Sequence, residues 1–365
     1  MINVSEYVSL GHPDKVADYI SEYILDRLLE QDPNTRYALE VQIKDNYVTL
    51  GGEITTSTEL SEPCWYNWTK EALAEIGYTQ EYCDRWGSEN TIDPSQLQVV
   101  AHISKQSPDI AQGVNNNGWG DQGIFWGLAT RDKQGLPNDY RLAKQLCDIL
   151  YLEAFAGAAW GLDIKTQVVT EDGEAATVIV AAPCMPGDYD KLKTRVFELV
   201  KKLCGETAYP IVNGTGAYIK HASIGDCGTT GRKLAVDFYG GNCPIGGGSP
   251  WTKDGTKADL ALNLYARYVA KETLKEQHGC KLVRAQLSCC IGCGGITIQC
   301  FDEHNNPIAH PVFLTADVDP TSIIEKFGLR KPIYADLCKY GMWVYVDAIT
   351  KDADNGQTEE ETSGR

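Results

Sequence analysis

The 365-residue sequence lacks the features that mark several common classes of protein. Basic side chains are in the minority, with 33 Lys and Arg against 50 Asp and Glu and a formal net charge of −17. Such a chain is poorly suited to nucleic acid, because phosphate binding needs a basic surface. No apolar run approaches the roughly 20 residues that span a bilayer, and the opening residues MINVSEYVSLGHPDK have neither the basic start nor the apolar core of a signal peptide. We therefore expect a cytoplasmic protein with no nucleic-acid and no membrane partner.

A disulfide framework is also not expected. The cysteines number 13, which is odd, and they are dispersed along the chain, so free thiols in a reducing cytosol are predicted. Cys290-Ile-Gly-Cys293 has metal-ligand spacing, with Cys289 and Cys300 nearby, which leaves a zinc or redox role open. No second C-x-x-C and no suitably spaced histidine pair follows it, and the segment is typical of a buried strand. We expect these cysteines to serve packing.

The length predicts two or three domains, and one pattern recurs three times: two β-rich runs, a turn and a helix. The paired runs are 36–43 with 47–55, 164–170 with 175–182, and 282–291 with 295–301, and the helices are 63–76, 189–203 and 321–327. The copies share no obvious sequence identity. We interpret them as three similar domains of an α+β fold, each a mainly antiparallel sheet with helices on one face. The predicted domains are 1–112, 113–220 and 221–365, the last with an acidic tail.

Two more helices are predicted over 14–29 and 256–276. In the first, apolar residues recur at helical spacing at Val16, Ile20, Ile24 and Leu28. Ser61 is a candidate cap for the helix over 63–76, and Thr256 with Asp259 resembles a capping box for the helix over 256–276.

The segment Gly11-His-Pro-Asp-Lys15 opens the first of these helices. Pro13 suits the first helical position, and the free N–H groups and helix dipole there favour an anion. His12 and Lys15 would add donors, and Asp14 could hold a cation that bridges phosphate oxygens. Equally, Asp14 could merely stabilise the first turn while His12 packs.

Two glycine-rich stretches follow. Residues 115–123 (NNNGWGDQG) form at least a flexible loop, and as a loop over a ligand they would offer Asp121 to a sugar hydroxyl. They match neither G-x-G-x-x-G nor a Walker A loop. Residues 225–259 carry Arg232, Lys233, Lys253 and Lys257 among glycines. Isolated lysines usually belong to a solvated face, but four cations on glycine loops of so acidic a chain indicate a polyphosphate site.

These residues together resemble the S-adenosylmethionine synthetase (methionine adenosyltransferase) family. The resemblance rests on six motifs in order: GHPDK at 11–15, GGEITTS at 51–57, KQSPDI at 105–110, GDQG at 120–123, GDCGTTGRK at 225–233, and GGG…KD…K.D from 246 to 259. It implies a three-domain α+β fold, a homodimer or dimer of dimers with shared active sites, two Mg²⁺ per site and a K⁺ activator. The implied reaction forms S-adenosylmethionine from ATP and L-methionine by sulfur attack on C5′, followed by hydrolysis of tripolyphosphate to pyrophosphate and phosphate.

The resemblance also implies a role for individual residues. The catalytic groups would be His12, Lys165, Arg232, Lys233, Lys253 and Lys257, which also bind ATP together with Lys15, Asp121, Asp163, Tyr218 and Asp226. Methionine would be held by Glu53, Gln106, Asp226 and Lys257. Mg²⁺ would be ligated by Asp14 and Asp259, and K⁺ by Glu40, since hard carboxylate oxygens suit these ions. Ordinary structural roles are the alternative for three of these residues. Glu40 and Glu53 alternate along strands as solvent-facing residues do, and Tyr218 could belong to the hydrophobic core.

The sequence also departs from the family pattern at several positions, one of them in the loop over 113–118, which the resemblance identifies as the family's gating loop. Leu10 replaces a glutamate before GHPDK, Trp119 replaces a small residue before GDQG, the loop between 113 and 118 is shortened, and Ala217 stands where an arginine is common. They motivate the alternative of a catalytically silent nucleotide-binding homologue. A third hypothesis is an enzyme that cleaves a polyphosphate or nucleotide without forming a sulfonium, which the cation cluster alone does not exclude.

Overall fold

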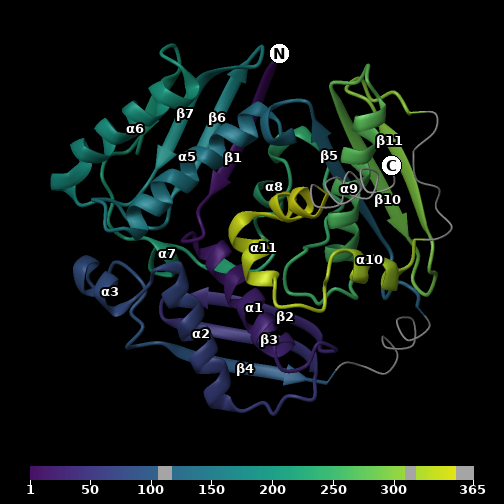
Figure 1. Ribbon diagram of the computed structural model, residues 1–365. Coiled ribbons are helices and arrows are strands. Elements are labelled where there is room, and N and C mark those ends of the chain that lie inside the picture. Colours follow the sequence, from purple (N-terminus) through teal and green to yellow (C-terminus); the bar gives the residue numbers. More distant parts are fainter. Residues whose placement is uncertain (106–116, 309–317, 351–365) are drawn as a thin grey trace, which may run out of the picture.

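The computed structural model describes residues 1–105, 117–308 and 318–350, and Figure 1 shows three sheets with their helices around a central helix, α11. The strands are β1 (Ile2–Val8), β2 (Arg36–Lys44), β3 (Tyr47–Thr55), β4 (Gln98–Ser104), β5 (Gly123–Thr130), β6 (Lys165–Glu171), β7 (Glu174–Ala181), β8 (Tyr209–Val212), β9 (Gly228–Thr229), β10 (Leu282–Cys289) and β11 (Ile296–Phe301). The helices of a full turn or more are α1 (Pro13–Leu29), α2 (Glu62–Ile76), α3 (Gln80–Trp86), α5 (Asn138–Phe155), α6 (Tyr189–Cys204), α7 (Ala222–Gly225), α8 (Leu234–Asp237), α9 (Ala258–Glu276), α10 (Pro320–Lys326) and α11 (Tyr334–Tyr340). The predicted α+β class is confirmed.

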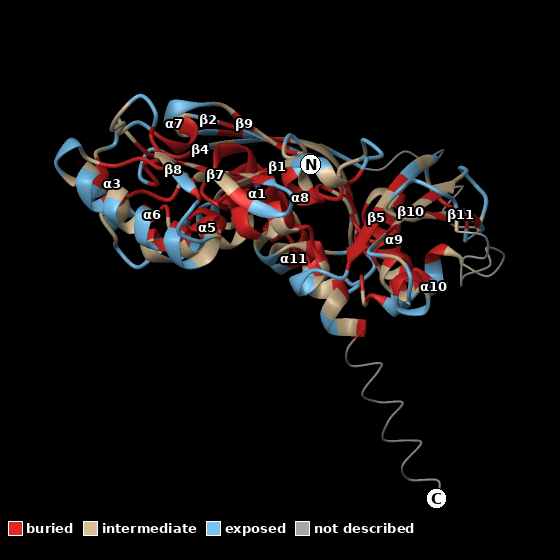
Figure 2. Cartoon of the chain, turned by 90° about the horizontal axis from the view of Figure 1, so that it is seen from above, coloured by how far each residue is buried: buried red, intermediate tan, exposed pale blue. Residues whose placement is uncertain are grey.

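Each sheet is built around one of the three predicted hairpins. The strand orders are β4-β3-β2-β9, β1-β6-β7-β8 and β11-β10-β5, and all neighbours are antiparallel except β3 with β4 and β7 with β8. The β6–β7 turn uses Asp172 and Gly173, both at positive φ, as a tight two-residue hairpin requires. In Figure 2, α5, α6 and α11 lie on one side of the strands, as predicted for helices on one face.

Every sheet also takes a strand from a distant part of the chain. The first strand, β1, pairs along its whole length with β6, from Ile2 with Glu171 to Val8 with Lys165. Strand β5 pairs with β10, and the two-residue β9 joins the edge of β2. The sheets therefore do not follow the three predicted segments strictly, and the domain boundaries near residues 112 and 220 stay predictions.

Several elements lie outside the repeated pattern that the sequence suggested: β1, α3, β4, β5, α5 and α11. The long helix α5 had a readable signal, because Tyr140, Ala143, Cys147 and Leu150 are all buried at spacings of three and four. Of the two predicted caps, Ser61 takes the N-cap position without the capping hydrogen bond, and Thr256 takes neither. Ser61 precedes α2 but makes no capping hydrogen bond, since its Oγ contacts the Sγ of Cys64. The N-cap residue of α9 is Lys257 and not the predicted Thr256. The N–H of Thr256 donates to Asp254 at 2.9 Å.

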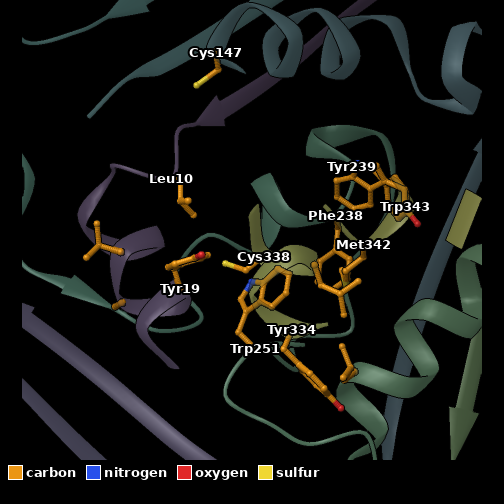
Figure 3. Packing of buried hydrophobic residues seen from close by; sticks show 14 of the residues in the cluster. Leu10, Tyr19, Cys147, Phe238, Tyr239, Trp251, Tyr334, Cys338, Met342 and Trp343 are labelled. Carbon is orange, nitrogen blue, oxygen red and sulfur yellow. The ribbon is translucent and has the colours of Figure 1, made fainter. Parts of the chain in front are cut away.

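Helix α1, which packs against α11, is buried on nearly every side. Its predicted apolar stripe is confirmed, with Val16, Ile20, Ile24 and Leu28 at 0% exposure. Helices α2 and α11 and strands β2 and β9 pack around it. Figure 3 shows Tyr19 of α1 beside Trp251 and Cys338, which come from distant parts of the chain.

Buried acidic side chains form a second stripe on α1. Asp18, Glu22 and Asp26 are spaced four residues apart and all three are buried. Each accepts a backbone N–H from a later segment: Asp18 from Gly231, Glu22 from Thr252, and Asp26 from Tyr334 and Ala335. This acidic stripe fastens three distant segments onto one helix, since a buried carboxylate needs such donors.

The protonation of Asp26 should make stability depend on pH. Burial raises the pKa of Asp26 to about 7, against about 3.9 in an unfolded chain. The folded protein then binds a proton that the unfolded chain releases, so this contribution to stability is complete below about pH 4 and is lost as pH rises through 7. We expect Asp26→Asn to gain stability relative to the parent protein between pH 5 and 8, measured by urea unfolding. For Asp32, N–H donors from Ser57 and Asn34 lower the pKa, so Asp32→Asn should show no such trend; a pH-independent effect of Asp26→Asn would contradict the prediction.

Candidate active site

The first turn of α1 provides the starting point of the site. His12 is the N-cap residue, and its Nδ1 accepts the N–H of Asp14 at 3.1 Å. Burial, helped by the nearby ammonium of Lys233, lowers the pKa of His12 to about 3. The imidazole is therefore neutral near pH 7, and with Nδ1 acting as acceptor its single proton lies on Nε2.

The segment 225–233 comes directly against this turn. Asp14 accepts the N–H of Thr229 at 3.0 Å through Oδ1 and the Nζ of Lys233 at 2.5 Å through Oδ2, and Arg232 lies 3.7 Å from Oδ1. Burial opposes ionisation of Asp14, but the bonds from Lys233 and Thr229 outweigh it and lower its pKa. The predicted association of His12, Asp14, Arg232 and Lys233 is thus present in the structure.

Glycine at position 228 permits this close approach. A Cβ placed there would lie 2.0 Å from the carbonyl oxygen of Pro13 and 2.9 Å from a methyl of Ile43. We expect Gly228→Ala to separate β9 from α1 and to cost about 1–3 kcal/mol of unfolding free energy, together with a large loss of activity. Gly187→Ala is the matched control, because a Cβ there meets nothing within 4 Å. Wild-type thermal stability of Gly228→Ala would contradict this packing.

Two further predicted residues lie within electrostatic reach of His12, and a third, Asp163, lies within reach of both of them. Lys165 and Asp226 both act on the pKa of His12, and Asp163 is acted on by Lys165, Asp226 and Lys233. Asp163 accepts the N–H of Ala222 at 2.9 Å, and burial raises its pKa to about 7. Tyr218 is half-buried; burial, with a contribution from Asp163, raises its pKa. Lys165 is partly exposed and lies 3.5 Å from Glu6.

A second group of predicted residues surrounds β2. Glu40 accepts hydrogen bonds from the hydroxyls of Thr230 and Thr252. Lys253 forms a bridge with Ala38 of the same strand and pairs with Asp259, while Lys257 lies 3.4 Å from Asp254. Glu53 of β3 is in register with Ala38, so it lies on the strand next to the one that Lys253 contacts.

Two other predicted ATP ligands are placed differently. The ammonium of Lys15 is buried, 2.6 Å from Asp237 and 3.1 Å from Asp18, and lies over the Trp251 ring at 4.5 Å. It is therefore fully engaged inside the fold. Asp121 is exposed before β5 and accepts the N–H of Gln122 at 2.7 Å. Gln106 lies outside the described residues, and its contact with methionine stays a prediction.

The predicted Mg²⁺ ligands Asp14 and Asp259 suit a metal ion that brings most of its other ligands with it. No group of three or more His, Cys, Asp or Glu side chains in the described ranges could by itself hold a metal ion. Asp14 and Asp259 are instead single carboxylates, each paired with a lysine. Mg²⁺ commonly binds through one or two carboxylates plus substrate phosphates and water. The residues therefore suit ions that arrive with a polyphosphate.

Sequence reasoning missed the residues that hold this arrangement in place. These residues are three buried aspartates. Asp18 accepts the N–H of Gly231, Asp237 accepts a hydrogen bond from the ammonium of Lys15, and Asp254 accepts the N–H of Tyr37. The spacing of acids along α1 was a usable signal, but an acidic stripe at intervals of four is also typical of a solvated face. Asp237 and Asp254 carried no signal beyond their proximity to predicted site residues.

A helix N-terminus flanked by a neutral histidine, an ionised aspartate and several cations, on a three-sheet α+β scaffold, is suited to a polyanionic ligand. Family models described as the N-terminal and C-terminal domains of S-adenosylmethionine synthetase match residues 1–108 and 221–350. The chain belongs to the S-adenosylmethionine synthetase family, and is thus an enzyme of the methionine adenosyltransferase class.

Individual relatives agree with this assignment. S-adenosylmethionine synthases of Sorangium cellulosum and of a Nitratiruptor species are each 34% identical over 92% of this chain, covering 84% and 91% of their own lengths. A solved structure titled as an unusual S-adenosylmethionine synthetase from Campylobacter jejuni aligns with a TM-score of 0.85 and 32% identity, covering 96% of this chain and 98% of that chain. In the described part of the chain, no helix is long and apolar enough to cross a membrane.

Proposed function

We propose that the protein forms S-adenosylmethionine from ATP and L-methionine by attack of the methionine sulfur on C5′, and then hydrolyses the displaced tripolyphosphate to pyrophosphate and phosphate. The observation that carries this proposal is the convergence of His12, Asp14 and Lys233 at the start of α1. The leaving group is a long polyanion, so the barrier falls when preorganised donors meet the charge that develops on it.

His12 is proposed to act at the bridging oxygen between C5′ and the triphosphate. Its neutral ring, with Nδ1 occupied by the N–H of Asp14, presents Nε2–H as a donor. A neutral donor can stabilise the departing oxygen without first losing a proton, and its low pKa keeps it in that form across the neutral range.

The cations are proposed to neutralise the phosphate chain. Arg232 and Lys233 stand at the start of α1, Lys165 lies beside them, and Lys253 and Lys257 approach from the segment before α9. Asp14 and Asp259 would each hold a Mg²⁺, and Glu40 a K⁺, whose role would be to screen phosphate charge and polarise its oxygens. Lys15, which is saturated by Asp18 and Asp237, is assigned a structural part.

The remaining assignments follow the family resemblance. Asp163 and Tyr218 would contact the nucleoside from beside His12, and Asp121 would approach it from the β5 side. Glu53, Gln106, Asp226 and Lys257 would hold the amino-acid end of methionine. Glu53 lies on β3, Asp163 just before β6 and Asp121 just before β5, so the site would be completed where the three sheets meet.

A homodimer with shared active sites is proposed as well. Exposed large apolar side chains lie on strands of all three sheets: Ile2, Val4, Tyr47, Val100, Ile124 and Tyr209. Such residues support burial by a second copy. Light scattering coupled to size exclusion should give twice or four times the chain mass, and an active monomer would overturn the proposal.

The decisive experiment incubates the enzyme with ATP, methionine, Mg²⁺ and K⁺ and measures S-adenosylmethionine by chromatography. Methionine-dependent product with equal amounts of pyrophosphate and phosphate is expected. Nucleotide binding by calorimetry without any turnover would instead support a silent homologue. Phosphate release from ATP at a rate that methionine does not change would support a nucleotide hydrolase.

A further inference from the structure

The Cys290–Cys293 pair occupies a different environment from the one expected. Strand β10 ends at Cys289, and both Cys290 and Cys293 are exposed in the turn that follows, so the predicted buried strand is wrong here. The N–H of Cys293 donates to the carbonyl of Cys290 at 3.1 Å, and Gly292 has φ +74°. This closes a β-turn whose first and last residues are the two cysteines.

The turn brings the thiols within range of each other. In a β-turn the first and last Cα atoms lie within about 7 Å, and disulfides span Cα separations of about 4.4–6.8 Å. The Cys290 thiol contacts the carbonyl of Ile291 within the turn at 3.7 Å, and the neighbouring Cys293 raises the pKa of Cys290. Gly292 provides the positive φ without steric cost, so the backbone suits ring closure.

The same turn also holds the segment before β5. The N–H of Trp119 donates to the carbonyl of Cys293 at 3.0 Å, and the N–H of Gly292 donates to the carbonyl of Trp119 at 2.8 Å. The indole N–H of Trp119 reaches Gly294 at 3.2 Å, and this side chain is fully buried. Next to them, the Sγ of Cys289 contacts the carbonyl of Asp121 at 3.4 Å. The position of residues 117–121 thus depends on the geometry of the cysteine turn.

We propose that Cys290 and Cys293 form a reversible dithiol–disulfide site, and that its oxidation stiffens the turn to which Trp119 is attached. The oxidant is a small-molecule disulfide such as oxidised glutathione. One cysteine thiolate attacks it and releases one thiol, and the second cysteine then displaces the other thiol, so two protons and two electrons leave the pair as one S–S bond forms. Both thiols are exposed in the turn, so either one can make the first attack.

A zinc site is the weaker alternative for this turn. Zinc needs four ligands, usually Cys and His, and the described residues contain no cluster of three such groups. Cys289 points toward Asp121 instead of joining the pair. Two exposed thiols without further ligands favour thiol chemistry.

The test uses the full chain, reduced and then exposed to defined ratios of oxidised and reduced glutathione. After trapping with N-ethylmaleimide and proteolysis, mass spectrometry should find the peptide with Cys290 and Cys293 two hydrogens lighter and missing two labels, and reduction should restore both. Cys290→Ser and Cys293→Ser should each give a stable glutathione adduct on the remaining cysteine, because neither variant has a second thiol to displace it. Absence of the internal disulfide while other cysteines oxidise would overturn the site.

A second measurement tests the coupling without relying on enzyme activity. Hydrogen exchange should become slower in peptides containing residues 117–121 when the wild-type protein is oxidised, because the disulfide restricts the turn that makes both backbone bonds to Trp119. The Cys290→Ser/Cys293→Ser double variant, treated identically, should show unchanged exchange and unchanged basal activity. Equal or faster exchange in the oxidised wild type would overturn the coupling, whatever reaction the enzyme catalyses.

Discussion

Replacing Lys233 with methionine is expected to reduce kcat for S-adenosylmethionine formation by about 10²–10³-fold, the loss typical of removing one donor to a developing charge. Lys233 is the cation nearest to Asp14 and acts on His12, so it is placed where triphosphate charge would develop. Because that charge grows as the bond to C5′ breaks, kcat should fall more than KM for ATP rises. Initial rates at saturating methionine measure both.

The control for this experiment is Lys191→Met. Lys191 lies on α6 and pairs with Asp188 at the surface. It belongs to none of the segments that carry the proposed site, so the kcat of Lys191→Met should equal that of the parent protein. Urea unfolding must show that Lys233→Met is folded under assay conditions. A folded Lys233→Met enzyme within fivefold of the parent kcat would mean that the site assignment is wrong.

Asp237→Ala is expected to destabilise the fold by about 3 kcal/mol, the lower end of the range for removing one partner of a buried ion pair. The change deprives the buried Lys15 ammonium of its nearest carboxylate and the Trp251 indole N–H of its acceptor. Asp18 at 3.1 Å compensates in part, which is why the upper end of the range is not expected. Denaturant unfolding followed by tryptophan fluorescence gives the free energy.

Two variants separate the buried charge from simple loss of packing. Lys15→Met combined with Asp237→Ala should recover part of the lost stability, because no ammonium is left without Asp237. Asp190→Ala removes an acid paired with Lys193 on the surface of α6 and should leave the unfolding free energy unchanged. If the double variant is less stable than Asp237→Ala alone, the ammonium is not the source of the effect.

The sequence predicted what is local in this fold and missed what is distant. The hairpins β2–β3, β6–β7 and β10–β11 were predictable, because alternating apolar residues and a short turn specify both strands together. The pairing of β1 with β6 or of β5 with β10 depends on contacts between segments far apart in the chain, which a periodic pattern does not encode. The helix over 14–29 was found from its apolar stripe, but its buried acids resembled a solvated face.

For the site, the motifs identified the residue types and the structure supplied their partners. GHPDK and GDCGTTGRK predicted that His12, Asp14, Arg232 and Lys233 would act together, and the structure brings them together. Lys15 carries the same charge as Lys233 but is directed inward to Asp237. Charge and spacing along the chain do not distinguish these two lysines, because only the three-dimensional arrangement decides which ammonium is enclosed.

The pairing of β1 with β6 has a consequence for how the chain is made on the ribosome. The partner strand of residues 2–8 is synthesised roughly 160 residues after them, which is about 8–30 s at 5–20 residues per second. During that interval β1 presents unpaired N–H and C=O groups and the side chain of Val8, which is buried in the folded chain. The nascent chain should therefore be a client of ribosome-associated chaperones until translation passes residue 171.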